Sequence, residues 1–257
     1  MPPFRSLLGV FPAPPKRVAL AVLQRLGWEI RRSPDGRYAM RRPYAWGRDY
    51  LPDLARLCPE VRTAFVVGAY TGTTSLRLAR RWPRARIYNF EPTPATFVQL
   101  EVATRGHPAI VNVQAAVGDK PGEATLHRTV NPDCNSLLMS NPEALPGMLD
   151  PAGQIAVPVV TLDDFCAEQG IEAVDYLHAD VQGFELPMLR GAAKLLSEGR
   201  IGVLLTEVCF DPLYHGQSRY HEVCAALDRY GYRFVTTQGL FREADVPRGG
   251  NFVFVRP

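Results

Sequence analysis

The stretch "FVVGAYTGTTSLRLARRW", residues 65–82, decides how the rest of this chain is interpreted. An aromatic and β-branched run begins at Phe65 and stops at Gly68. A short turn with a second glycine, Gly72, follows, and three hydroxyl residues then open a helical pattern. Strand, glycine turn and helix in this order are typical of α/β units whose backbone approaches a nucleotide-like ligand. The stretch has two glycines where a dinucleotide loop has three, so the ligand class stays open at this point.

The pattern continues from Thr63 onward as apolar strands that alternate with helices. Strands are expected at 63–67, 85–90, 109–117, 174–180, 201–208, 233–237 and 251–255. Helices are expected near 72–82, 94–104, 185–196 and 218–230. This alternation predicts an α/β fold with a mostly parallel sheet covered on both faces. The last two strands are joined by "QGLFREADVPRGG", which has no helical pattern, so we expect them to form an antiparallel pair.

Composition shifts divide the chain into regions. Residues 1–60 are rich in Pro and Arg and are expected to form an N-terminal extension with helices near 16–27 and 48–57. Residues 61–257 are expected to form the main domain. Within it, four prolines and several Asn, Ser and Gly residues predict a long irregular loop at 131–153, of the kind that often covers a binding site.

Charge and cysteine usage exclude some functional classes. The net charge is +3, with 29 basic and 26 acidic residues, so nothing predicts a nucleic-acid partner. The five cysteines are scattered without a CxxC pair, which favours a reducing compartment over a disulfide framework or a zinc site. No apolar run reaches the length of a membrane span and no signal peptide is evident, so we expect a cytoplasmic protein. A helix at 16–27 would pack on the domain or on a partner chain, which allows a homo-oligomer, or lie at a membrane surface.

Glu91 follows the second predicted strand, 19 residues past Gly72. That is where an acidic residue accepts hydrogen bonds from ribose hydroxyls in nucleotide-binding α/β units. A dinucleotide would need the third glycine, whereas S-adenosylmethionine, which has no phosphate, tolerates a looser turn. The remaining alternative is an ordinary turn with a surface glutamate. Asp119, in "GDKPG", could reach a ribose or an adenine, or it could simply be a turn residue.

Acidic residues also end the fourth and fifth predicted strands. His178, Asp180 and Gln182 occupy every second position at the end of the fourth strand and so share one side of it, and Glu207 ends the fifth strand. A carboxylate directly after an apolar strand needs a partner or a function, so these side chains could bind substrate hydroxyls, act as a base or hold a metal. They are too few to define a metal site, and we favour hydroxyl binding and base chemistry. Glu185 is interpreted first as a helix-start residue.

Several motifs together resemble the FkbM-type methyltransferases. They are "GAYTG", "NFEPTPATFVQL", "AAVGD", "NSLL", "VPVVTLDDF", "VDYLHADVQGFELPMLRGA" and "TEVCFDPLY", over about residues 63–256. The resemblance implies a Rossmann-like class I methyltransferase fold with a seven-stranded sheet. It also implies S-adenosylmethionine as cofactor and O-methylation of a hydroxyl on a sugar, a glycan or a natural product. By position, it implies a cofactor pocket formed by Gly68, Ala69, Tyr70, Gly72, Glu91, Asp119 and Asp180.

The chain departs from the family pattern at three positions. Val66 and Tyr70 stand where the first motif usually has Asp and Asn, and His178 stands where Lys is usual. A histidine there would titrate near neutral pH. We predict Asp180 or His178 as the base that activates the substrate hydroxyl, with Glu207 orienting it. The alternative is a non-catalytic relative that uses the same fold for binding.

Overall fold

The computed structural model describes residues 10–11, 29–32, 38–41, 51–243 and 246–257. Its centre is a seven-stranded sheet with strand order β12-β13-β11-β10-β4-β5-β6. The strands are β4 (Thr63–Val67), β5 (Arg86–Phe90), β6 (Ile110–Val113), β10 (Val174–Ala179), β11 (Ile201–Cys209), β12 (Arg233–Glu243) and β13 (Val246–Val255). All pairs are parallel except those of β13, which runs antiparallel to both β11 and β12. The prediction of a mostly parallel sheet ending in an antiparallel pair is confirmed.

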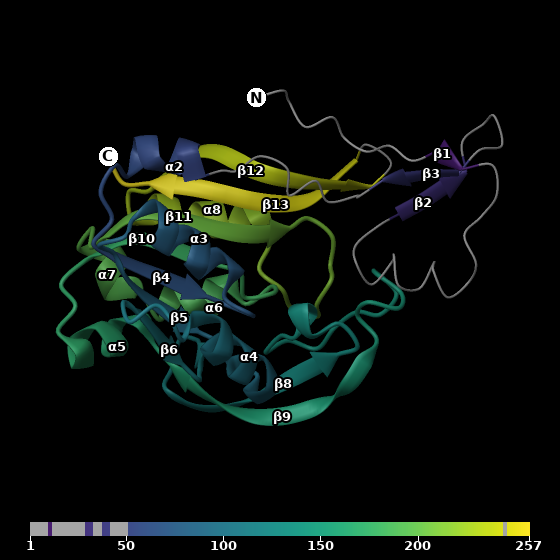
Figure 1. The fold of residues 1–257 in the computed structure, drawn as a ribbon, viewed down its shortest axis with the longest axis horizontal. Helices are drawn as coiled ribbons and strands as arrows, with labels where there is room; N and C mark the ends of the chain where they lie inside the picture. The colour runs from purple at the N-terminus through teal and green to yellow at the C-terminus, as the bar shows by residue number, and fades with distance from the viewer. Residues whose placement is uncertain (1–9, 12–28, 33–37, 42–50, 244–245) are drawn as a thin grey trace.

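Helices cover both faces of this sheet (Figure 1). One face packs against α2 (Leu51–Leu57), α3 (Thr73–Arg81) and α4 (Pro94–Thr104). The other packs against α5 (Leu162–Gln169), α6 (Glu185–Arg190), α7 (Ala193–Ser197) and α8 (Tyr220–Arg229). Every helix in the described ranges is too short or too polar to cross a bilayer.

The structure explains why β4, the first strand of the domain, is a continuous apolar run in the sequence. Phe65 and Val67 point into the core beneath α5–α8, whereas Val66 points into the core beneath α2–α4. Phe65 makes edge-on ring contacts with Phe90 and Phe165, at centroid distances of 5.6 and 5.8 Å. Both faces of the strand are therefore buried, as is usual for parallel strands between two helical layers.

The expected third strand at 109–117 is in fact two strands. β6 ends at Val113, and β7 (Ala116–Val117) leaves the main sheet to pair with β9 (Pro151–Val160). β9 also pairs with β8 (Gly122–Thr129), which gives a second, three-stranded sheet. Figure 1 shows β8 and β9 beyond the β6 edge, at the opposite end of the molecule from β12 and β13. Because β6 is the edge strand, the chain is free to change partners there.

The helix expected over 185–196 is also divided, into α6 and α7. Gly191 lies between them, and a Cβ on this residue would come within 1.9 Å of the Gly118 carbonyl oxygen. The carboxylate of Asp163 accepts hydrogen bonds from the first turn of α7, at Lys194 N (2.9 Å) and Leu195 N (3.0 Å). Close packing at the glycine and a new N-terminal cap together favour two short helices over one.

The described part of the N-terminal region contains three short strands that were not expected from the sequence. β1 (Val10–Phe11), β2 (Glu29–Arg32) and β3 (Tyr38–Arg41) form an antiparallel sheet in the order β1-β3-β2. The turn signal "SPDGRY" begins between β2 and β3, and such signals favour hairpins. The helix expected near 48–57 corresponds to α2, within the described residues of that segment. The helix expected at 16–27 lies outside the described residues.

Candidate active site

The glycine turn after β4 lies against the end of β10. Gly68 has a φ of +77°, and a Cβ on it would lie 1.9 Å from the carbonyl oxygen of Asp180. Asp180 in turn donates its backbone N–H to the Val67 carbonyl at 2.9 Å. Gly68 is therefore required by the close approach of two strand ends, and this approach brings Asp180 beside the turn.

Glu91 organises the same turn from the end of β5. Its Oε2 accepts a hydrogen bond from the backbone N–H of Tyr70 (3.1 Å), and its Oε1 accepts one from Thr93 (2.8 Å). Glu91 is 6% exposed. Burial raises the pKa of this carboxyl, and the hydrogen bonds from Thr93 and Tyr70 oppose the rise by stabilising the charge. Tyr70 itself adopts a left-handed conformation, with φ +49°, which is uncommon for an aromatic residue.

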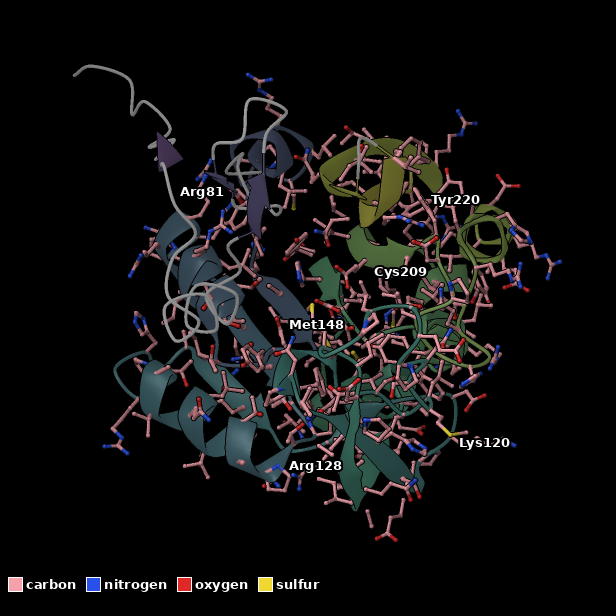
Figure 2. The ribbon with its side chains drawn as sticks, turned by 90° about the vertical axis from the view of Figure 1, so that its right-hand side faces the viewer. Arg81, Lys120, Arg128, Met148, Cys209 and Tyr220 are labelled. Carbon is pink, nitrogen blue, oxygen red and sulfur yellow. The ribbon has the colours of Figure 1, made fainter. Side chains whose placement is uncertain are left out.

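A cavity opens at the carboxyl ends of the parallel strands, as the sequence predicted for a ligand in this fold. It encloses about 600 Å³, part of which is open to solvent. Its walls come from the ends of β4 and β5, from β7, from residues 180–184 and from residues 132–137. Figure 2 looks onto this end of the sheet, where Cys209 marks the end of β11 and Met148 belongs to the predicted 131–153 loop.

The cavity wall is acidic. Three carboxylates line it, Glu91, Asp133 and Asp180, and none of the described residues that line it is Lys, Arg or His. Burial, with the nearby charge of Asp180, raises the pKa of Asp133 to about 6. Such a wall favours a ligand that carries positive charge and disfavours the pyrophosphate of a dinucleotide. Among the described residues, no group of three or more His, Cys, Asp and Glu side chains is arranged to hold a metal ion.

Asp180 and Glu207 form a carboxyl pair at the ends of β10 and β11. Burial raises the pKa of Asp180, and the hydrogen bond that the two carboxyls share opposes this rise at Asp180 and adds to the rise at Glu207. Burial and the charge of Asp180 also raise the pKa of Glu207 well above its ordinary range, so Glu207 holds the proton that the pair shares. Asp180, the more acidic member, lines the cavity, and Glu207 lies behind it. The two strand-end acids predicted from sequence do come together.

Glu185 does begin a helix, as predicted, but it is buried, with 3% of its surface exposed. Its Oε1 accepts a hydrogen bond from the Gly183 backbone N–H at 3.0 Å. Burial, with a contribution from the charge of Asp180, raises its pKa to about 8. At neutral pH this side chain is therefore mostly protonated.

The structure places five of the predicted site residues away from the cavity wall, one of which is Glu207 behind Asp180. Ala69 is packed in the core beneath α2–α4, and a Cβ on Gly72 would meet Leu100 of α4 at 2.8 Å. Asp119 pairs with Arg190 (3.2 Å) on the outside. His178 is buried in β10, where its Nδ1 lies 3.2 Å from the Tyr176 hydroxyl. Burial lowers its pKa to about 4, so the imidazole is neutral at neutral pH.

The structure adds two residues that sequence reasoning missed, Asp133 and Tyr214. Asp133 lies in a short 3₁₀ helix, Pro132–Cys134, at the start of the predicted 131–153 loop. Tyr214 is 2% exposed, and its hydroxyl lies within hydrogen-bonding distance of two acceptors for its single hydrogen, the Cys134 carbonyl (2.9 Å) and Gln182 Oε1 (2.6 Å). The only sequence signal for Tyr214 was its place at the end of the motif "TEVCFDPLY", and the "NPDC" turn gave no signal for Asp133.

A family model described as the Methyltransferase FkbM domain matches residues 67–234, which include the glycine turn, Glu91, Asp180 and Glu207. The chain belongs to the FkbM methyltransferase family. The resemblance read from the sequence motifs is thus confirmed, and the described cavity lies within the matched domain.

One curated relative of this FkbM chain is the 2-O-methyltransferase NoeI of Sinorhizobium fredii, which is 26% identical over 159 residues. The match covers 59% of this chain and 65% of the relative, which is less than two thirds of the relative's length.

Two solved structures are similar to this chain at low identity. Aeropyrum pernix fibrillarin in complex with S-adenosyl-L-methionine has a TM-score of 0.45 and 18% identity, over 89% of this chain and 83% of that one. The N-methyltransferase NodS of Bradyrhizobium japonicum, in complex with S-adenosyl-L-homocysteine, has a TM-score of 0.49 and 13% identity, over 83% and 89%. At these values neither structure bears on what this chain binds.

Proposed function

We propose that this chain transfers a methyl group from S-adenosylmethionine to a hydroxyl oxygen of a sugar, a glycan or a natural product. The observation that carries the proposal is the acidic cavity at the strand ends, with three carboxylates and no basic side chain among its described lining residues. S-adenosylmethionine has a sulfonium and an ammonium charge, which suit such a wall. The FkbM family and the 2-O-methyltransferase relative support the same reaction class.

The residues at the cavity fit this cofactor. The turn at Gly68 and Tyr70 and the carboxylate of Glu91 would hold its nucleoside part. Each oxygen of Glu91 already accepts one backbone N–H, and each has a further lone pair that can accept a ribose hydroxyl. The cofactor supplies a methyl group that its sulfonium has already activated, so the protein mainly aligns the reactants and excludes water.

Asp180 is the best placed base. It lines the cavity, and it is the ionised member of its pair because Glu207 holds the shared proton. It would accept the proton of the attacking hydroxyl, a contribution typically worth about 10²–10⁴-fold in rate. His178 does not line the cavity in the structure. The acidic wall also favours a neutral acceptor over one that carries phosphate or carboxylate groups next to the reacting hydroxyl.

The first test is calorimetry with S-adenosylhomocysteine on wild type, Glu91→Gln and a control, Glu101→Gln, which changes an exposed glutamate of α4. A glutamine at 91 can accept only one of the two backbone N–H groups through its oxygen and presents an amide to the other. We expect about 10–100-fold weaker binding for Glu91→Gln, since a hydrogen bond to a charged group is worth roughly 1.5–3 kcal/mol. Equal affinity in all three proteins would refute the assignment of Glu91.

The second test is methyl transfer to a panel of neutral glycans and glycosides. Cofactor binding without transfer to any acceptor would favour the alternative, a binding protein on the methyltransferase fold. One observation bears on that alternative: Val66, at the position where the family usually has Asp, is completely buried beneath α2–α4 and offers nothing to a ligand.

A further inference from the structure

Gln182 is one of the residues that line the cavity, and its backbone conformation is unusual. It lies just past the end of β10, after Asp180 and Val181, and has a φ of +51°, one of two non-glycine residues with positive φ in the described chain. The next residue, Gly183, has a φ of +93°. A glutamine held in a left-handed conformation generally needs support from its surroundings, and such residues gather at functional sites.

The side-chain amide of Gln182 donates to both members of the carboxyl pair. Its Nε2 lies 2.6 Å from Asp180 Oδ1 and 3.1 Å from Glu207 Oε2. The shorter bond goes to Asp180, which is the more acidic of the two. Hydrogen bonds from an amide stabilise a carboxylate more than a carboxylic acid, so this contact favours charge on Asp180.

The rest of Gln182 holds the two segments that lie over the pair. Its Oε1 accepts the hydroxyl hydrogen of Tyr214 at 2.6 Å, and its backbone carbonyl accepts that of Ser136 at 2.7 Å. The Cys134 carbonyl, 2.9 Å from the Tyr214 hydroxyl, is the other acceptor within reach of that hydrogen. One residue therefore connects the carboxyl pair to the 132–137 segment of the cavity wall and to the connection after β11.

The groups that face the pair explain why an amide suits this position. Asp133 and Cys134 face it from the 3₁₀ helix, Glu185 from α6, Cys209 from β11 and Tyr214 from the following connection. Each of these groups is neutral or negative. In such surroundings a neutral donor stabilises the charge on Asp180, whereas a further carboxylate would oppose it.

We propose that Gln182 is a positioning residue: it keeps Asp180 ionised and aimed at the cavity, leaves the shared proton on Glu207, and fixes the 132–137 segment over the pair. The catalytic consequence rests on the proposed methyl transfer, in which Asp180 is the base. The arrangement of the pair itself does not depend on that function and can be measured separately.

Two variants separate the donor from the bulk of the side chain. Gln182→Met keeps a similar volume and removes both donor and acceptor. Gln182→Glu keeps the size and the acceptor for Tyr214 but replaces the donor with a third carboxylate. The matched control is Gln154→Met, which makes the same change at an exposed residue of β9 whose Nε2 contacts His127. Thermal unfolding of all four proteins establishes that they are folded.

The first readout is infrared titration of the buried carboxyls, with bands assigned through Asp180→Asn and Glu207→Gln. We expect the midpoint of Asp180 to rise by about one pH unit or more in both Gln182 variants, because a hydrogen bond to a charged group is lost. Gln154→Met should leave it unchanged. This readout needs neither cofactor nor turnover, so it decides the inference even if wild type binds no S-adenosylhomocysteine and the proposed function fails.

The second readout is steady-state kinetics across pH. We expect kcat to fall by roughly 10–100-fold in Gln182→Met, with the acid limb of the profile moved to higher pH and the cofactor affinity within about threefold of wild type. An Asp180 midpoint that is unchanged in both variants would overturn the proposal. The proposal would also be overturned if Gln182→Met lost cofactor affinity and Gln182→Glu restored both that affinity and kcat, with an unchanged pH profile. That pattern would mean that the side chain acts through packing alone.

Discussion

Glu185→Gln should make the protein more stable, and increasingly so as the pH rises. Glu185 is 3% exposed, and its burial raises the pKa from 4.5 to about 8 in the folded protein. In the unfolded chain the same carboxyl is ionised above the ordinary value. When the protein folds at neutral pH, Glu185 must therefore either take up a proton or be buried with its charge. A glutamine keeps the oxygen that accepts the Gly183 N–H and requires neither.

The magnitude follows from linkage between protonation and folding. A group whose pKa is raised on folding contributes stability that is fully present below the unfolded value and is lost as the pH rises through the folded value. Each pH unit in that window changes the free energy of unfolding by about 1.4 kcal/mol. Neutral pH lies about 2.5 units above the pKa of Glu185 in the unfolded chain. The free energy of unfolding of wild type should therefore be lower there by roughly 3 kcal/mol, a loss that the variant does not suffer.

The assay is denaturant unfolding of wild type, Glu185→Gln and an exposed control, Glu123→Gln, at several pH values from 4 to 8. The difference in free energy of unfolding between Glu185→Gln and wild type should be small near pH 4 and should grow steadily toward pH 8. Glu123→Gln should show no such growth. If the difference for Glu185→Gln stays constant across this range, Glu185 is ionised in the folded protein and the explanation by burial is wrong.

Three further substitutions test the geometry of the turn and of the surface near it. Gly68→Ala places a Cβ 1.9 Å from a carbonyl oxygen at the end of β10 and should lower the free energy of unfolding by more than about 3 kcal/mol. In the same denaturant series, the control Gly106→Ala, whose Cβ would have nothing within 4 Å, should change it by less than about 1 kcal/mol. Tyr70→Asn puts a residue that tolerates positive φ at +49°, so thermal unfolding should show equal or higher stability, and a clear decrease would mean that the tyrosine ring contributes more than its strain costs. Asp119→Asn removes only an ion pair outside the cavity, so calorimetry should find the same affinity for S-adenosylhomocysteine, and a loss of binding would place this residue in the cofactor site.

The central strands were readable from the sequence because both of their faces are buried. β4, β5, β10 and β11 are short apolar runs, and their observed bounds lie within a residue or so of the expected ones. The hairpin β12–β13 was found but underestimated, since it continues well beyond the expected 233–237 and 251–255. Its extra residues mix glycine, proline, polar and apolar residues without a regular alternation, and paired backbone groups hold them in the ladder.

Two errors come from interactions between distant parts of the chain. The break between α6 and α7 depends on how closely Gly191 approaches Gly118, and no local propensity shows this. The change of partner at β7 depends on the position of β9, some forty residues later. The helix α5 was not among those expected, although it had a local signal: Thr161 accepts a hydrogen bond from the Asp164 N–H in the manner of a helix cap.

The sequence by itself determined the parts of the site that belong to single strands and their turns: Gly68, Glu91, Asp180 and Glu207 all lie where strands end, and parallel strands end on one edge of a sheet. Only the tertiary structure decided what each of these groups does. Burial depth and the distance to other carboxyls determine which acids are ionised, and both depend on segments far apart in the chain. That is why Glu207 holds a proton and Asp180 faces the cavity, and why His178, two residues before Asp180, is a neutral residue of the core.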